Sequence, residues 1–292
     1  MNAGVCDGVE SNRIIVGDCR SVLRTLPSRS VNLIPTDPPF NIGLGYAGYD
    51  DNQPLDEYLN MLRDVASEAR RVLKPEGSIF LFMGQRYQAH AFTILQEAGF
   101  HWRNSVVWHY AFGTNQKRKF TPSWTMIHYF SCHPDAFTFN ADAVRVPSAR
   151  QLLYNDKRAN SKGKVPDDTW VLLPKESPDH FRPDQDAWLV SRVCGTFTER
   201  VGHTTQLPLE LVERIVRVAS NPGDLVVDPF AGSGTVPVAA RNLGRRYIGI
   251  EISEETAAIA RCRLAVANAV TTPSPGSIAL GDVAGSTPPS AA

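Results

Sequence analysis

Apolar and polar residues alternate along this chain with two different periods, and the alternation predicts a regular succession of strands and helices. Short apolar runs typical of buried strands lie at residues 13–16, 31–34, 78–83, 104–108, 225–228 and 247–250. Stretches that place apolar residues on one helical face lie at residues 21–26, 55–73, 87–97, 209–218, 236–243 and 253–264. Strands and helices in this order predict an α/β fold, with a mainly parallel sheet and helices on both of its faces.

One long segment departs from this regular pattern. From residue 112 to about 201, prolines, charges and isolated aromatic residues replace the alternation. We therefore expect a core built from residues 1–111 and 202–267, with an inserted lobe at 112–201. Residues 268–292 are mostly Ala, Pro, Ser, Thr and Gly, a composition that cannot bury a core, so we expect a disordered tail there.

The composition limits the classes of partner and of site. The formal net charge is +0, so any binding of nucleic acid requires a local basic patch. The five cysteines are scattered without a Cys-x-x-Cys pair and the seven histidines form no cluster, which indicates no metal site. No apolar run reaches about 18 residues and the N-terminus has no basic-then-apolar signal, so we expect a cytoplasmic protein without membrane contact.

A glycine-rich turn follows the predicted strand at residues 225–228. Gly232 and Gly234 allow backbone N–H groups to approach a ligand at the start of the next helix, and Asp228 adds an acceptor. Glu251 closes the following strand, where it can accept from both hydroxyls of a ribose. A dinucleotide fingerprint would need glycine at Pro237, and a P-loop would need lysine after Thr235. A nucleoside without a pyrophosphate therefore fits this turn better.

A second rigid loop follows the strand at residues 31–34. The two prolines of Asp37-Pro38-Pro39-Phe40 cannot continue a central strand, so the loop holds the Asp37 carboxylate and the Pro38 carbonyl as preorganised acceptors. The Phe40 ring offers a stacking surface beside them. The glycines of the next segment suit a mobile lid and lie at Gly43, Gly45 and Gly48. A plain Pro-Pro turn is the alternative interpretation.

Asp18 follows the strand at residues 13–16, where parallel strands of α/β sheets bind ligands. Its carboxylate could accept from the adenine amino group of a cofactor, or it could cap the next helix. The sequence favours neither role.

The two loops together resemble known motifs. Asp-Pro-Pro-Phe at residues 37–40 and Phe-Ala-Gly-Ser-Gly-Thr at 230–235 are similar to the catalytic and cofactor motifs of amino-group DNA methyltransferases, which modify adenine N6 or cytosine N4. Their order resembles the permuted β group of that family. Gly17-Asp18 and residues 203–208 match further family elements, although Leu207 replaces the usual lysine and Phe40 the commoner tyrosine.

This resemblance implies a Rossmann-like methyltransferase fold, S-adenosyl-L-methionine as cofactor and base flipping of the target. It implies a catalytic group formed by Asp37, Pro38, Pro39 and Phe40. It implies a cofactor site formed by Asp18, Asp228, Phe230, Gly232, Ser233, Gly234, Thr235 and Glu251. Residues 1–111 then form the catalytic half of the core, 112–201 the target-recognition lobe and 202–267 the cofactor-binding half. The implied partner is double-stranded DNA, and a homodimer and a companion restriction endonuclease of a restriction-modification system are compatible with the resemblance.

Basic residues of the lobe are candidates for phosphate contacts. They are Lys117, Arg118, Lys119, Arg145, Arg150, Lys157 and Arg158. A solvated charged face is the alternative interpretation of such runs. Asn140 could read base edges, although the sequence favours an Asx turn that leaves a strand at residues 137–139.

Several activities compete with amino methylation of DNA. A cytosine-C5 enzyme would need a cysteine after a proline, and no cysteine here follows one. Asp before the two prolines favours adenine within the family, whereas Phe after them also occurs in cytosine-N4 enzymes. An RNA methyltransferase and a non-catalytic nucleic-acid-binding module on a vestigial fold stay open, and Pro237 disfavours a nicotinamide oxidoreductase.

Overall fold

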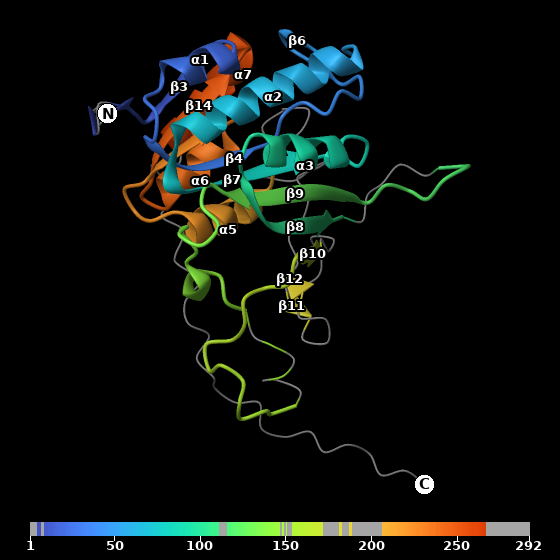
Figure 1. The fold of residues 1–292 in the computed structure, drawn as a ribbon, viewed down its shortest axis with the longest axis vertical. Coiled ribbons are helices and arrows are strands. Elements are labelled where there is room, and N and C mark those ends of the chain that lie inside the picture. The colour runs from blue at the N-terminus through green and yellow to red at the C-terminus, as the bar shows by residue number, and fades with distance from the viewer. Residues whose placement is uncertain are drawn as a thin grey trace.

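An eight-stranded sheet forms the centre of the computed structural model, which describes residues 5–6, 9–110, 116–146, 148, 150, 154–171, 181–182, 187–188 and 206–266 (Figure 1). The strand order is β10-β8-β9-β7-β4-β13-β14-β3. The bounds of these strands are β3 (Arg13–Val16), β4 (Val31–Thr36), β7 (Leu73–Met83), β8 (His101–His109), β9 (Trp124–Ser131), β10 (Thr169–Val171), β13 (Leu225–Asp228) and β14 (Arg246–Glu251).

Within this sheet only β9 runs against its neighbours, while the other pairings from β3 across β14, β13 and β4 to β7 are parallel. The carboxyl ends of β4, β13, β14 and β3 therefore meet at one edge. The predicted mainly parallel α/β fold is confirmed. Its consequence for function is that the loops after these four strands share one side of the molecule.

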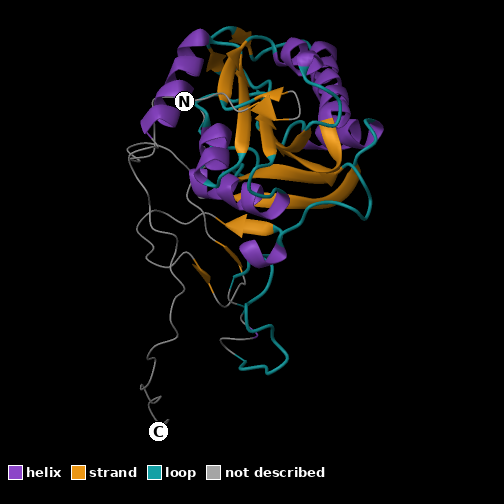
Figure 2. Cartoon of the chain, turned by 90° about the vertical axis from the view of Figure 1, so that its left-hand side faces the viewer, coloured by secondary structure: helices purple, strands orange, loops and turns teal. Residues whose placement is uncertain are grey.

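Six described helices cover the two faces of the sheet, as Figure 2 shows. One face carries α1 (Cys19–Thr25), α2 (Leu55–Val72) and α3 (Gln88–Glu97), and the other carries α5 (Leu209–Ala219), α6 (Thr235–Asn242) and α7 (Glu254–Val266). Along β13, Leu225 and Val227 pack toward the first set and Val226 toward the second. A strand that is apolar on both faces is typical of a parallel sheet between two helical layers.

Helix α2 forms where the sequence predicts it because its apolar residues recur every three or four positions. Tyr58, Leu62, Val65 and Ala69 are buried against the core, and Arg70 and Arg71 occupy the last turn, where they complement the helix dipole. The helix ends at Leu73, where the backbone becomes extended. Strand β7 then runs through Pro75 to Met83, so it starts five residues before the strand that the sequence predicts.

The sequence analysis missed β9, which lies inside the segment 112–201 yet occupies a central place in the sheet between β7 and β8. Three polar residues interrupt its apolar pattern, Thr125, His128 and Ser131, and all three are buried. The His128 ring bonds to the carbonyl of Gln88 over 2.9 Å, so a long-range partner satisfies it. The segment 112–201 therefore supplies β9 and β10 to the core sheet, and its role in target recognition stays a prediction.

Short elements complete the described fold. The glycine-rich segment after Phe40 forms a hairpin of β5 (Gly45–Tyr46) and β6 (Tyr49–Asp50). The remaining pieces are β1 (Val5–Cys6), β2 (Val9–Glu10), β11 (Phe181–Arg182), β12 (Ala187–Trp188) and a 3₁₀ turn, η1 (Ala141–Ala143). Residues 203–205 and the tail at 268–292 lie outside the described residues. None of the described helices is long and apolar enough to cross a membrane.

Candidate active site

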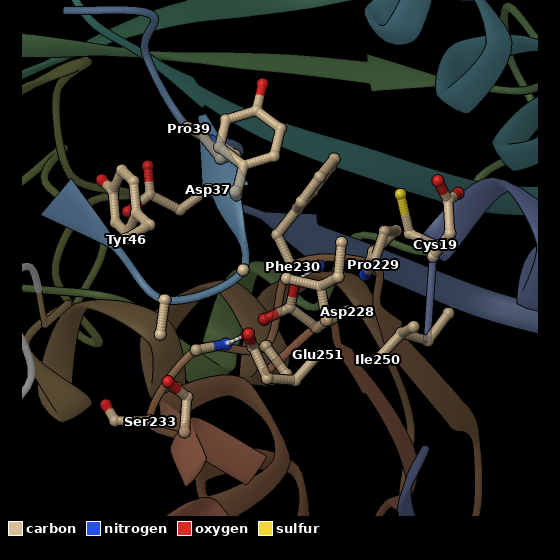
Figure 3. Close-up of a pocket in the computed structure, with 18 of the residues that line it drawn as sticks. Cys19, Asp37, Pro39, Tyr46, Asp228, Pro229, Phe230, Ser233, Ile250 and Glu251 are labelled. Atoms are coloured by element: carbon tan, nitrogen blue, oxygen red, sulfur yellow. Dashed lines mark hydrogen bonds between the residues drawn. The ribbon is translucent and has the colours of Figure 1, made fainter. Parts of the chain in front are cut away.

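A cavity of about 730 Å³ opens at the edge where the parallel strands end (Figure 3). Its walls come from both halves of the chain, with Asp37 and Pro39 from the loop after β4 and residues 228–233 from the turn after β13. These loops are neighbours because β4 pairs with β13 through Leu33 and Val226. The structure thus brings together two motifs that are separated by about 190 residues in the sequence.

The glycine turn is shaped by two left-handed residues. Gly232 has φ +50° and Gly234 has φ +83°, a region that strongly favours glycine. A Cβ on Gly234 would also lie 2.8 Å from the Cβ of Ala260 in α7, so the turn packs directly on that helix. Helix α6 begins at Thr235, immediately after the turn.

Glu251, the last residue of β14, lies beside this turn. One carboxylate oxygen accepts the N–H of Gly232 over 3.0 Å (Figure 3). The other accepts the N–H of Ser253 over the same distance. Each carboxylate oxygen has a second lone pair. The carboxylate is therefore oriented by the protein and retains capacity for the two hydroxyls of a ribose.

The side chains of Ser233 and Thr235 are buried and are held by the protein. Arg263 of α7 donates to the Ser233 carbonyl (2.9 Å), the Ser233 hydroxyl (3.0 Å) and the Thr235 hydroxyl (3.1 Å). These hydrogen bonds hold the turn in place, and both Ser233 and Thr235 still line the cavity. Sequence reasoning missed Arg263 because no local pattern links it to a turn about 30 residues earlier.

Two carboxyl groups are removed from water at the strand ends. Asp228 is buried and accepts the N–H of Phe230 over 3.0 Å, and burial raises its pKa to about 8. Asp37 is partly accessible, but its Oδ1 atom is buried without a hydrogen-bond partner among the described residues, and burial raises its pKa to about 7. A buried acceptor without a donor costs about 1–3 kcal/mol, so Asp37 is suited to receive a donor from a ligand.

The loop after β4 is braced from two sides. The buried Tyr58 of α2 donates to the Pro39 carbonyl over 2.9 Å. The buried Asp51 carboxylate accepts three backbone N–H groups of the following turn, from Asn41 (2.8 Å), Ile42 (3.2 Å) and Leu44 (2.9 Å). Sequence reasoning missed both residues, since a tyrosine on an apolar helix face is typical of a core and a lone aspartate is typical of a surface loop.

Phe40 lies beside the cavity and not in its wall. Its ring packs against Gly84, where an added Cβ would approach it to 2.9 Å, and it joins the core beneath α2. The absence of a side chain at Gly84 makes room for this ring. Its predicted contact with the target base stays a prediction.

Asp18 caps helix α1, one of the two roles that the sequence leaves open. Its carboxylate accepts the backbone N–H of Arg20 over 2.8 Å and pairs with the Arg20 guanidinium over 2.7 Å. The hydrogen bond from Arg20 lowers the pKa of Asp18. Asp18 also lines the cavity, so a cofactor contact stays a prediction.

The charge of the cavity wall fits a cationic nucleoside. Acidic side chains predominate there: Asp18, Asp37, Asp50, Glu57, Asp228, Glu251 and Glu255. Arg20 is the basic residue of the described wall, and it is paired with Asp18. This wall would repel a pyrophosphate and attract a sulfonium or ammonium group. The described residues contain no group of three His, Cys, Asp or Glu side chains arranged for a metal ion.

The predicted phosphate contacts divide into two groups. Arg145 pairs with Asp142 over 2.7 Å, and Arg150 and Arg158 both pair with Asp156, over 3.0 and 2.9 Å. The other residues, Lys117, Arg118, Lys119 and Lys157, are exposed and have no acidic partner among the described residues. The loop between β8 and β9 therefore carries three adjacent cations without an acidic partner among the described residues. The paired arginines keep part of their charge, because Asp156 serves two arginines and Asp142 also binds Lys162 over 2.7 Å.

Asn140 has a structural role. Its side-chain amide donates to the carbonyls of Arg217 (3.1 Å) and Ser220 (2.9 Å) at the end of α5, and to the side chain of Asn221 (3.1 Å). The amide thus satisfies carbonyls that a helix end leaves without partners. The suggestion that Asn140 reads base edges is not supported, because its donors are used within the protein.

Comparison with known proteins agrees with this geometry. A family profile described as DNA methylase, N6/N4 type, matches residues 31–261. The type II methyltransferase M.HpaI of Haemophilus parainfluenzae is 36% identical over 253 residues, 86% of this chain and 74% of the relative. The DNA adenine methyltransferase YhdJ of Escherichia coli K12 is 33% identical over 266 residues, 89% of this chain and 85% of the relative.

Solved structures share the fold. TTHA0409 from Thermus thermophilus, complexed with S-adenosyl-L-methionine, is 27% identical and superposes with a TM-score of 0.56 over 88% of this chain and 94% of that chain. The cytosine-N4-specific PvuII DNA methyltransferase is 20% identical with a TM-score of 0.63, covering 87% of this chain and 86% of that chain, and shows the fold alone. Profile, relatives and fold agree, and the chain belongs to the N6/N4 DNA methylase family.

Proposed function

We propose that this enzyme methylates N6 of adenine in double-stranded DNA. The coarser activity follows from the family: the chain is an S-adenosyl-L-methionine-dependent DNA methyltransferase that modifies an exocyclic amino nitrogen. Two observations favour adenine over cytosine. An aspartate precedes the two prolines of the catalytic loop, as in adenine enzymes that this loop resembles, and the chain is 33% identical to a DNA adenine methyltransferase.

The single observation that carries the assignment of the catalytic group is the buried, unpartnered Oδ1 atom of Asp37. The lone pair of an exocyclic amino nitrogen is delocalised into the base, which makes the nitrogen a weak nucleophile. Acceptors that bind both of its hydrogens localise that lone pair and turn it toward an electrophile. Asp37 supplies one such acceptor at the wall of the cavity.

The Pro38 carbonyl is our candidate for the second acceptor. Tyr58 occupies the next carbonyl, that of Pro39, whereas the Pro38 carbonyl accepts no hydrogen bond in the described part of the chain. Tyr58 thereby orients the peptide that carries Pro39 and leaves the preceding carbonyl for the substrate. Pro39 and Phe40 complete the rigid turn.

The acidic cavity is our candidate for the cofactor site. When bound, S-adenosyl-L-methionine supplies an electrophilic methyl group on a cationic sulfur. We assign its ribose hydroxyls to Glu251 and its carboxylate end to the backbone N–H groups of Ser233 and Thr235, since those of Gly232 and Gly234 are donated within the protein. Asp18 adds negative charge to the wall and can accept from the adenine amino group, and Asp228 gains charge when a cation binds beside it.

Asp37 is also suited to accept the proton that the amino nitrogen releases. Methyl transfer makes this nitrogen cationic and strongly acidic, so even a weak base removes its proton. A carboxylate with a pKa near 7 is poised to take it at neutral pH. Asp37 therefore acts first as a hydrogen-bond acceptor and then as a proton acceptor.

The test uses the full-length chain, tritiated S-adenosyl-L-methionine and unmethylated genomic DNA, followed by digestion to nucleosides. Label in N6-methyladenine supports the proposal, whereas label in N4-methylcytosine contradicts the adenine assignment. A protein that binds DNA without labelling it is a non-catalytic module, and label in RNA alone contradicts a DNA substrate. Asp37→Asn should abolish labelling while cofactor binding persists, and Asp135→Asn, an exposed acid outside the cavity wall, is the matched control.

The homodimer, the companion restriction endonuclease and the recognition role of residues 112–201 stay predictions. Sedimentation of the purified chain, with and without a duplex, tests the first of them. An exchange of residues 132–168 with those of a relative tests recognition, because β9 and β10 would both be kept intact.

A further inference from the structure

An aromatic side chain beside three cations stands free in solvent on the loop that joins β8 to β9. Phe120 is 100% exposed, more than any other large apolar residue that the structure describes. Full burial of such a side chain is worth roughly 1.5–3 kcal/mol, so its exposure is costly unless a partner covers it. Its neighbours Lys117, Arg118 and Lys119 are exposed as well.

The topology places this loop on the side of the active site. Strand β8 is antiparallel to β9, and β9 is antiparallel to β7, so β8 runs in the same direction as β7 and β4. The loop after β8 therefore leaves the sheet at the same edge as the loop that carries Asp37. Three strand spacings separate β8 from β4, which is about 14 Å. Figure 1 shows the described part of this loop standing out beyond the ends of β8 and β9.

The charge on the loop is available to a ligand. Within the described residues, no acid pairs with Lys117, Arg118 or Lys119. Arg145, Arg150 and Arg158 each pair with an aspartate, although Arg150 and Arg158 share Asp156. Three adjacent cations with no such partners are suited to phosphates of a nucleic acid backbone. An apolar ring beside phosphate-binding cations is the arrangement of proteins that insert a wedge between base pairs.

We propose that Phe120 enters the base stack of the duplex at the target site and fills the space that the extruded base leaves, while Lys117, Arg118 and Lys119 bind the flanking phosphates. This inference rests on the proposed function, because extrusion of the base is what creates the space. Its role differs from that of Asp37, which contacts the extruded base: Phe120 is a positioning residue that stabilises the base outside the duplex.

The test uses the full-length chain and a duplex that contains its methylation site, mapped by sequencing genomic DNA methylated by the chain, with 2-aminopurine in place of the target adenine. Binding of the wild-type chain should raise the fluorescence of 2-aminopurine as it leaves the stack. In Phe120→Ala we expect this increase to be largely lost and the dissociation constant for DNA to rise roughly 5- to 100-fold, since stacking on one aromatic ring has this magnitude. Phe120→Trp should restore both signals.

Trp102→Ala is the matched control. Trp102 is a half-exposed aromatic residue at the start of β8, at the opposite edge of the sheet. It should leave DNA affinity and base extrusion unchanged. The affinity for S-adenosyl-L-methionine should be unchanged in every variant, because none of these residues lines the cavity.

Three outcomes overturn the inference. Wild-type affinity and extrusion in Phe120→Ala would show that the ring does not enter the stack. A change from dimer to monomer in that variant, with extrusion intact, would assign Phe120 to a contact between copies. Loss of S-adenosyl-L-methionine binding in Phe120→Ala would indicate that the ring contributes to folding. If the wild-type chain labels no DNA, the proposed function fails; if it labels DNA and Phe120→Ala behaves like wild type, this inference alone fails.

Discussion

The hydroxyl of Tyr58 donates a 2.9 Å hydrogen bond to the carbonyl of Pro39, and this contact ties helix α2 to the loop after β4. Burial raises the pKa of Tyr58 well above its ordinary value, so the hydroxyl stays a donor throughout the working range of pH. Two prolines make the loop rigid, and Tyr58, about twenty positions later in the sequence, fixes the position of the Pro39 carbonyl. The geometry of the proposed catalytic loop thus depends on the packing of a core helix.

Removal of the Tyr58 hydroxyl should slow methyl transfer. In Tyr58→Phe the Pro39 carbonyl loses its donor, and we expect turnover to fall about 10- to 100-fold, since a buried hydrogen bond and its unsatisfied acceptor are worth about 1–3 kcal/mol. Cofactor affinity should be unchanged. Tyr87→Phe is the control, because the Tyr87 ring packs 5.1 Å from the Tyr58 ring and its hydroxyl does not brace the loop. Single-turnover rates with saturating DNA measure the effect; equal rates in the two variants would remove Tyr58 from loop positioning.

The glycine turn should depend on its anchor in α7. Arg263→Met removes three hydrogen bonds to Ser233 and Thr235, and we expect the dissociation constant for S-adenosyl-L-methionine to rise about tenfold, because the turn loses its fixed shape. Arg261→Met is the matched control on the same helix, since Arg261 pairs with the exposed Glu254. Isothermal titration compares the variants. An unchanged affinity in Arg263→Met would mean that the turn keeps its shape without this anchor.

Most of the sheet and its helices could be predicted, because their apolar residues recur with the period of a strand or of a helix and face the core. Strand β13 is apolar at Leu225, Val226 and Val227, and α2 repeats its apolar positions over five turns, so local pattern was sufficient. Strand β9 could not be found in this way. His128 is buried there because the carbonyl of Gln88, forty residues earlier, accepts from its ring, and a single-sequence pattern counts such a residue as polar.

The candidate site likewise contains residues that the sequence pattern predicts and residues that it does not predict. Asp228 and Glu251 end strands, and Asp37 and the glycines follow strand ends, so their meeting at one edge follows from the order of elements. Tyr58, Arg263 and Asp51 act on those loops from elsewhere in the chain, and nothing beside them in the sequence distinguishes them from core or surface residues. The pairing of Arg145 and Arg158 with aspartates likewise depends on the folding of their loops.

A side chain on the glycine turn should destabilise the fold and the cofactor site together. Gly234→Ala must hold an alanine at φ +83° and place its Cβ 2.8 Å from the Cβ of Ala260, so we expect a loss of about 2–4 kcal/mol in the free energy of unfolding. Gly244→Ala, at φ +72° with open space around it, isolates the backbone strain, and we expect about 1 kcal/mol there. Denaturant titration gives both values. Equal losses would mean that α7 yields to the new methyl group without cost.

Binding of the cationic cofactor should release protons near neutral pH. Burial raises the pKa of Asp228 to about 8 and that of Asp37 to about 7, so both groups carry protons in part of the free enzyme at about pH 6.5. A bound cation stabilises their charged forms, lowers both pKa values and expels those protons. Affinity should therefore increase by up to about tenfold between roughly pH 6 and pH 8 and level off above that range, since each unit of pKa shift corresponds to about 1.4 kcal/mol.

Titration calorimetry at about pH 6.5 in two buffers of different ionisation enthalpy counts the released protons. Asp37→Asn should remove the larger share, because a shift of about one unit carries its pKa from about 7 through the assay pH, and Asp228→Asn the smaller, because a carboxyl with a pKa of about 8 stays mostly protonated at about pH 6.5 after the same shift. The double variant measures the proton exchange of the ligand itself, which is subtracted from the other values. Proton release in wild type equal to that of the double variant would show that both carboxyls are already ionised in the free enzyme, and that the acidic wall attracts the cofactor without titrating.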